Sequence, residues 1–99
     1  MADHLSQALT LANKDFNLEI PSSEVSSADD FQKILTNLIR HLLDHDFDRL
    51  LNGLYRIDVS EEKVKLAMAS EGDIAEHIAL LIIEREMEKV VTREKYKEK

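Results

Sequence analysis

The chain has 99 residues, which is enough for one domain with a single hydrophobic core. It carries 20 acidic and 13 basic residues, and this net charge of −7 disfavours nucleic acid and anionic membranes as partners, because both bind clustered Lys and Arg. Cysteine is absent, so disulfides and thiolate chemistry are excluded. Few aromatic residues, two Gly and one Pro favour helices over strands.

Residues 1–27 differ from the rest of the chain and are predicted to form an N-terminal arm that is partly flexible. Apolar residues with helical spacing occupy its first part, and residues 20–27 are rich in Ser and contain the Pro. The arm is either a mobile tail or a short amphipathic helix that docks on an apolar groove of its own chain or of a partner. The spacing favours docking. The apolar residues are Leu5, Ala8, Leu9, Ala12 and Phe16.

A long helix is predicted to begin next to Ser27. Ser27 suits the N-cap position, and Asp29 and Asp30 in the first turn match the helix dipole. The apolar residues that follow recur at i, i+3, i+4 and i+7, which is the strongest amphipathic pattern in the sequence. They are Phe31, Ile34, Leu35, Leu38, Ile39 and Leu42.

A second apolar stripe runs from Phe47 to Leu54. If one straight helix continued through both segments, this stripe would lie about 140° around the helix axis from the first. We therefore predict a break, with Asp44 or Asp46 as the cap of a new helix. The alternative is a hairpin, because Asn-Gly at 52–53 is a turn signal and residues 55–59 alternate like a strand. A helix to about residue 56 is favoured, since a lone hairpin would have no partner sheet.

Two further helices are predicted after a short linker at 57–59. Ser60 is expected to cap a helix that buries Val64, Ala67 and Met68, and Gly72 to end the turn that follows it. Asp73 would then cap the last helix. The predicted architecture is an all-α bundle of four helices over residues 28–96, with the N-terminal arm as a short fifth helix if it docks.

The last helix carries apolar residues on two sides. A helix with two apolar stripes must be covered on both, by its own chain or by a second copy. We therefore predict a homodimer, with Ala79, Ile83, Met87 and Val90 at the interface. At about 100° per residue, one stripe contains Ile74, Ile78, Leu81 and Ile82, and the other, roughly opposite, contains Ala79, Ile83, Met87 and Val90.

No catalytic motif is present, and the chain is predicted not to be an enzyme and to bind no cofactor or metal. One group of residues has the chemistry of metal ligands: His41 and His45 are four residues apart, Asp48 follows, and His77 could join from the last helix. The predicted break inside this group removes the shared helix face. The simpler interpretation is that its aspartates cap helices.

The segments LLNGLYRIDVSEEKV (residues 50–64) and IIEREMEKV (residues 82–90) resemble small bacterial helical proteins of unknown function. The resemblance covers about two-thirds of the chain. It implies an all-α fold and no particular activity or functional residue.

The predicted function is that of a non-catalytic, self-associating helical protein, of the protein-interaction or adaptor kind. The alternative is a small metal-binding protein or metal-dependent hydrolase that uses the His and Asp residues named above. The N-terminus lacks the features of a signal peptide, and the longest apolar run, 78–83, is too short to cross a bilayer. A cytoplasmic location is therefore expected.

Overall fold

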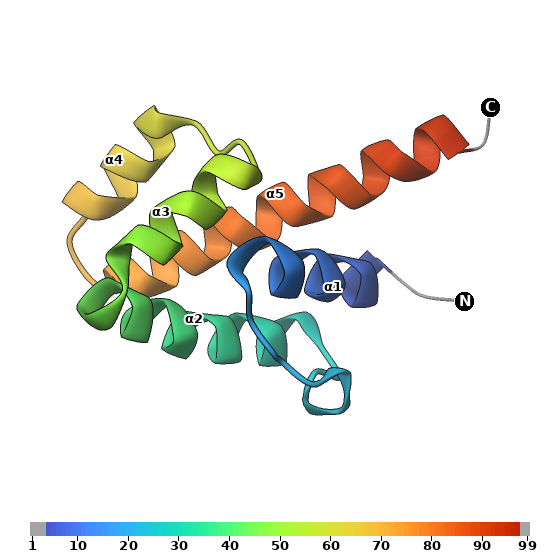
Figure 1. Ribbon diagram of the computed structural model, residues 1–99, viewed down its shortest axis with the longest axis horizontal. Helices are drawn as coiled ribbons and strands as arrows, with labels where there is room; N and C mark the ends of the chain where they lie inside the picture. Colours follow the sequence, from blue (N-terminus) through green and yellow to red (C-terminus); the bar gives the residue numbers. More distant parts are fainter. Residues whose placement is uncertain (1–3, 98–99) are drawn as a thin grey trace.

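The computed structural model describes residues 4–97, which form five α-helices and one short 3₁₀ helix (Figure 1). No strand occurs among these residues, so the all-α prediction is confirmed and 47–56 is helix, not hairpin. Residues 1–3 of the predicted arm lie outside the described part, as do 98–99. The elements are α1 (His4–Phe16), η1 (Ser22–Glu24), α2 (Ala28–His45), α3 (Phe47–Arg56), α4 (Glu61–Ala69) and α5 (Ile74–Lys97).

Three helices begin at the caps that the sequence predicts. The Ser27 hydroxyl accepts a hydrogen bond from the N–H of Asp30 at 3.2 Å, and the Asp46 carboxylate accepts one from Arg49 at 3.3 Å. Asp73 accepts bonds from two N–H groups in the first turn of α5. These bonds satisfy N–H groups that have no partner inside the helix, which explains why α2 stops and α3 starts at Asp46.

The short helix α4 departs from its prediction in two details. Ser60 precedes the helix as expected, but its side chain accepts no hydrogen bond from it. Met68, predicted to be buried, is exposed, because α4 packs mainly against α5 and presents only Ala67 as a fully buried residue. Gly72 has a φ of 101°, the left-handed conformation that was expected between α4 and α5.

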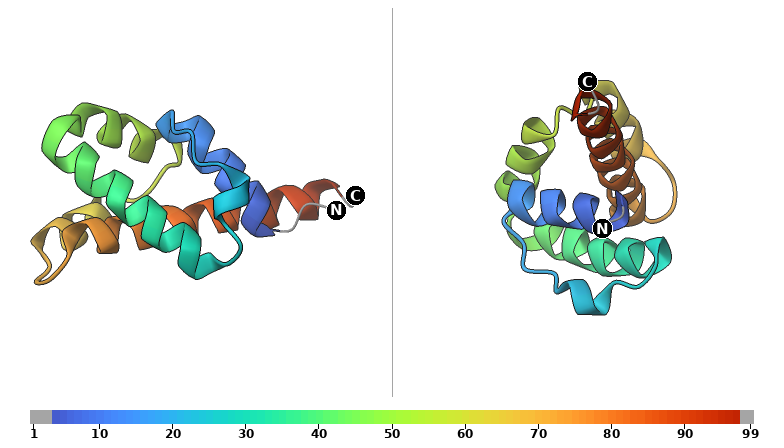
Figure 2. Two further views of the ribbon diagram at one scale, coloured as in Figure 1. Left: turned by 90° about the horizontal axis from the view of Figure 1, so that it is seen from below. Right: turned by 90° about the vertical axis from the view of Figure 1, so that its right-hand side faces the viewer.

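Helix α5 is the longest element, and α1, α2 and α4 all pack against it. Helix α3 packs against α1 and α2, on the side of the molecule away from the last turns of α5 (Figures 1 and 2). Those last turns extend past α1 and α2 in both figures. The C-terminal part of α5 therefore has fewer neighbours than its middle.

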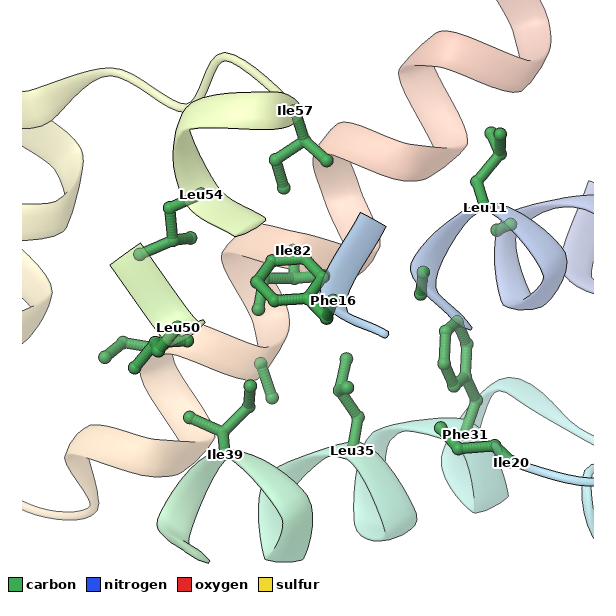
Figure 3. Close-up of a cluster of buried hydrophobic side chains, with 14 of the residues drawn as sticks. Leu11, Phe16, Ile20, Phe31, Leu35, Ile39, Leu50, Leu54, Ile57 and Ile82 are labelled. Atoms are coloured by element: carbon green, nitrogen blue, oxygen red, sulfur yellow. The ribbon is translucent and has the colours of Figure 1, made fainter. Parts of the chain in front are cut away.

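The N-terminal arm docks on its own chain through α1. Leu9 and Phe16 are buried and Leu5 is half-buried, as the docking alternative requires. The ring of Phe16 lies at the centre of a cluster that includes Leu50 and Ile82 (Figure 3). The buried side chains of α1 thus belong to the same core as those of α2, α3 and α5.

Candidate functional site

The inner face of α5 is one broad apolar face with a carboxylate near its centre. Its fully buried residues span about 120° of the helix circumference at about 100° per residue. The two predicted stripes are the flanks of this face, and α1 and α2 pack against it. The buried residues are Ala75, Ile78, Ala79, Ile82, Glu86 and Val90.

The four predicted interface residues divide into two pairs. Ala79 and Val90 are fully buried within the chain, whereas Ile83 and Met87 are half-buried and sit at the edge of the inner face. Beside them, Leu80 is 43% exposed and Val91 is 41% exposed. We call Leu80, Ile83, Met87 and Val91 the outer stripe. Their spacing of i, i+3, i+7 and i+11 places them along one line of the helix surface.

Charged residues lie at both ends of the outer stripe. Glu76 lies one turn before Leu80, and its carboxylate accepts a hydrogen bond from Gln32 of α2 at 3.4 Å. Lys95 lies one turn after Val91 and is exposed. Residues 88–99 contain five Lys or Arg and three Glu, in a protein with an overall charge of −7. The stripe therefore begins at a carboxylate and ends at Lys95, beside Glu94, whose carboxylate lies 2.7 Å from His4 of α1.

Glu86 faces the C-terminal end of α1. Its side chain is 0% exposed, and among the residues that the structure describes neither carboxylate oxygen has a hydrogen-bond partner. Lys89 Nζ lies 3.5 Å from Glu86 Oε1 and 3.3 Å from Asp15 Oδ2 of α1. The pKa of Glu86 is raised to about 8: burial, the largest cause, and the Asp15 carboxyl raise it, and the Lys89 ammonium lowers it.

Glu86 is not among the residues predicted from the sequence. Its position does indicate burial, because it belongs to a series of residues four apart on one side of α5. The other members, Ile78, Ile82 and Val90, are apolar and fully buried. A carboxylate at that position of an apolar series is costly to bury, and it marks the centre of the inner face.

The residues with metal-ligand chemistry are only partly brought together. The rings of His41 and His45 lie 4.6 Å apart between centroids, on the exposed side of the last turn of α2. Asp48 lies beyond the break in α3, and His77 belongs to α5. Within residues 4–97, no three His, Cys, Asp or Glu side chains are grouped so as to hold a metal ion. The metal-dependent function stays a prediction, which elemental analysis of the protein purified without a His tag would test.

An apolar groove lies between α3 and α4. Its volume is about 310 Å³, and Tyr55, which is 72% exposed, is one of the residues that line it. The other residues that line the groove are Leu51, Leu54, Val59, Glu61, Val64 and Lys65.

Comparison with protein-family models, with curated proteins and with solved structures found no match to this chain. The resemblance to small bacterial helical proteins therefore stays a prediction. In the described part of the chain, no helix is both long enough and apolar enough to cross a membrane.

Proposed function

We propose that this protein is a non-catalytic helical protein that pairs with a second copy of itself, α5 against α5, through the outer stripe. The observation that carries the proposal is the line of four apolar side chains left uncovered or half-covered on the longest helix. Apolar side chains at this spacing on a helix surface are the usual contact between two packed helices. Such pairing is the basis of an interaction or adaptor role.

The charges at the two ends of the stripe favour an antiparallel pair. If Leu80 of one copy meets Val91 of the other, Glu76 lies opposite Lys95 at both ends of the contact. A parallel pair would place Glu76 next to Glu76 and Lys95 next to Lys95. In an antiparallel pair, the positive N-terminal end of each helix dipole also lies next to the negative C-terminal end of the other, which is favourable. The second copy is therefore the partner whose charge pattern fits the surface.

The size of the stripe sets the expected strength of the pair. Four apolar side chains bury less than the roughly 1,200–2,000 Å² of a standard stable interface. Glu84 and Glu88, both exposed, add negative charge at one margin. We therefore expect a reversible dimer that is populated at about 10–500 μM and not an obligate one.

Disulfide trapping tests both the pairing and its direction, because the chain contains no cysteine of its own. In the antiparallel pair the twofold axis passes near residues 85 and 86. Two copies of residue 87 then lie about 5 Å apart along the helix axis, and two copies of residue 80 about 16 Å apart, at a rise of about 1.5 Å per residue. Disulfides join Cα atoms less than about 7 Å apart.

Met87→Cys is therefore expected to form a disulfide-linked dimer on mild oxidation, and Leu80→Cys is not. A mixture of Leu80→Cys and Val91→Cys chains is expected to form the mixed dimer. Linkage of Leu80→Cys to itself would show a parallel pair. If no variant is linked at high micromolar concentration, self-association through α5 is excluded.

A further inference from the structure

Helix α1 is held against the C-terminal half of α5 by a small set of charged side chains. At one end, His4 Nε2 lies 2.7 Å from Glu94 Oε2, an ion pair only while the imidazole is protonated. At the other end, Asp15 of α1 faces Glu86 and Lys89 of α5. The apolar contacts of Leu9, Leu11 and Ala12 lie between these two ends of the helix. The charged group at Asp15 is the buried one.

The group of Asp15, Glu86 and Lys89 contains two carboxyls and one ammonium. The side chain of Asp15 is 13% exposed and that of Lys89 is 26% exposed, so little water reaches the group. One ammonium can balance one carboxylate. If both carboxyls are ionised, an uncompensated negative charge lies in a largely dry contact, which is strongly unfavourable.

Protonation of Glu86 removes that excess charge. A neutral Glu86 leaves Asp15 and Lys89 as a matched ion pair, and the position of Glu86 among apolar residues makes it the carboxyl that holds the proton. The described groups that act on Glu86 electrostatically are Asp15, from α1, and Lys89, from its own helix. The contact between α1 and α5 is therefore sensitive to one proton.

We propose that Asp15, Glu86 and Lys89 form a pH-sensitive latch, which holds α1 on α5 while Glu86 is protonated and loosens α1 when Glu86 ionises. Glu86 belongs to the inner face of α5 and the outer stripe lies beside that face, so the latch does not depend on pairing of two chains. Its opening uncovers the part of the inner face next to Val90. The loosening proceeds as the pH rises to about 8, the pKa of the buried Glu86 carboxyl.

Amide hydrogen exchange of the full chain tests the latch. The measured quantity is the protection of α1 in the wild type relative to its protection in Glu86→Gln, from about pH 6 to about pH 9, after correction for the intrinsic exchange rate at each pH. We expect this ratio to fall by about tenfold or more over the range, because the opening of α1 becomes up to tenfold more favourable with each unit of rise in pH below the pKa of Glu86. Glu86→Gln stays neutral at position 86, and the His4–Glu94 pair is common to both proteins, so the ratio isolates the effect of Glu86.

Glu84→Gln is the matched control, since Glu84 lies on the same helix and is exposed; it should behave as the wild type. A ratio that does not change with pH would overturn the latch, and so would a protection of α1 equal to that of α2, because α1 would then open only when the whole chain unfolds. If Glu86→Gln fails to fold, the carboxyl ¹³C shift of Glu86 in the wild type decides. A titration well above the ordinary range of a glutamate is expected, and one near pH 4 would overturn the proposal.

Discussion

The ring of Phe16 fills the space that a side chain at Gly53 would need. A Cβ placed on Gly53 would lie 2.1 Å from Cδ1 of Phe16, far inside van der Waals contact. Arg49, one turn earlier in α3, donates from Nε to the carbonyl oxygen of Phe16 at 3.1 Å and from Nη2 to that of Asn17. The C-terminal end of α1 is thus joined to α3 by close packing and by hydrogen bonds.

Gly53→Ala is expected to destabilise the protein, although alanine is the better helix former. The helix propensity gained is about 1 kcal/mol, whereas forcing a methyl group against a fully packed ring costs about 1–3 kcal/mol and shifts α1. Urea denaturation should show a lower midpoint. Asn52→Ala, at an exposed neighbouring position, is the control and should leave the midpoint unchanged or raise it. A Gly53→Ala protein as stable as the wild type would contradict this packing.

The dipeptide Asn52-Gly53 has a reason for its glycine that no local sequence pattern contains. As a dipeptide it is a hairpin signal, but here the glycine is required by Phe16, 37 residues earlier in the sequence. No local pattern contains that contact. The start of α2, the break at Asp46 and the cap at Asp73 were predictable because each depends on neighbouring residues and on hydrogen bonds within one helix turn.

The face of α5 was predicted less well than its ends. The two stripes predicted for α5 do not contain Glu86, because an apolar pattern is built from apolar residues alone. In the structure Ile82 and Glu86 are both fully buried, side by side on one broad face. Whether a charged residue at such a position is buried depends on the helix that covers it, here α1, and the sequence did not decide where α1 would dock.

The stability of the protein is expected to depend on pH through Glu86. Its folded pKa of about 8 lies above the ordinary value of 4.5, so the folded state holds a proton that the unfolded state releases. The stability contributed by that proton is complete below about pH 4.5 and is lost as the pH rises to about 8. The loss is at most about 1.4 kcal/mol per pH unit.

Comparison of the wild type with Glu86→Gln at each pH isolates this effect, because the other titrating groups are common to both proteins. The difference in free energy of unfolding should change steadily between about pH 5 and about pH 8, with the wild type losing stability relative to the variant. A difference that is independent of pH would mean that Glu86 is ionised in the folded protein throughout the range.

The two serines that precede helices are expected to differ in importance. Ser27 accepts a hydrogen bond from the first turn of α2, whereas the Ser60 side chain accepts none from α4. Ser27→Ala should therefore lower the free energy of unfolding by about 1 kcal/mol, and Ser60→Ala by clearly less. Thermal or urea denaturation of the two variants measures the difference. Equal effects would show that the cap at Ser27 contributes nothing specific.

Self-association through the outer stripe is tested by the molar mass of the full-length chain in solution. Light scattering over a concentration range from about 10 μM to about 500 μM should show the mass rising from 11.4 kDa towards twice that value. Met87→Glu, which places a charge on the stripe, should stay at the mass of one chain with an unchanged helical circular dichroism spectrum. A wild-type mass that remains at 11.4 kDa over the whole range would contradict the pairing of α5 with α5.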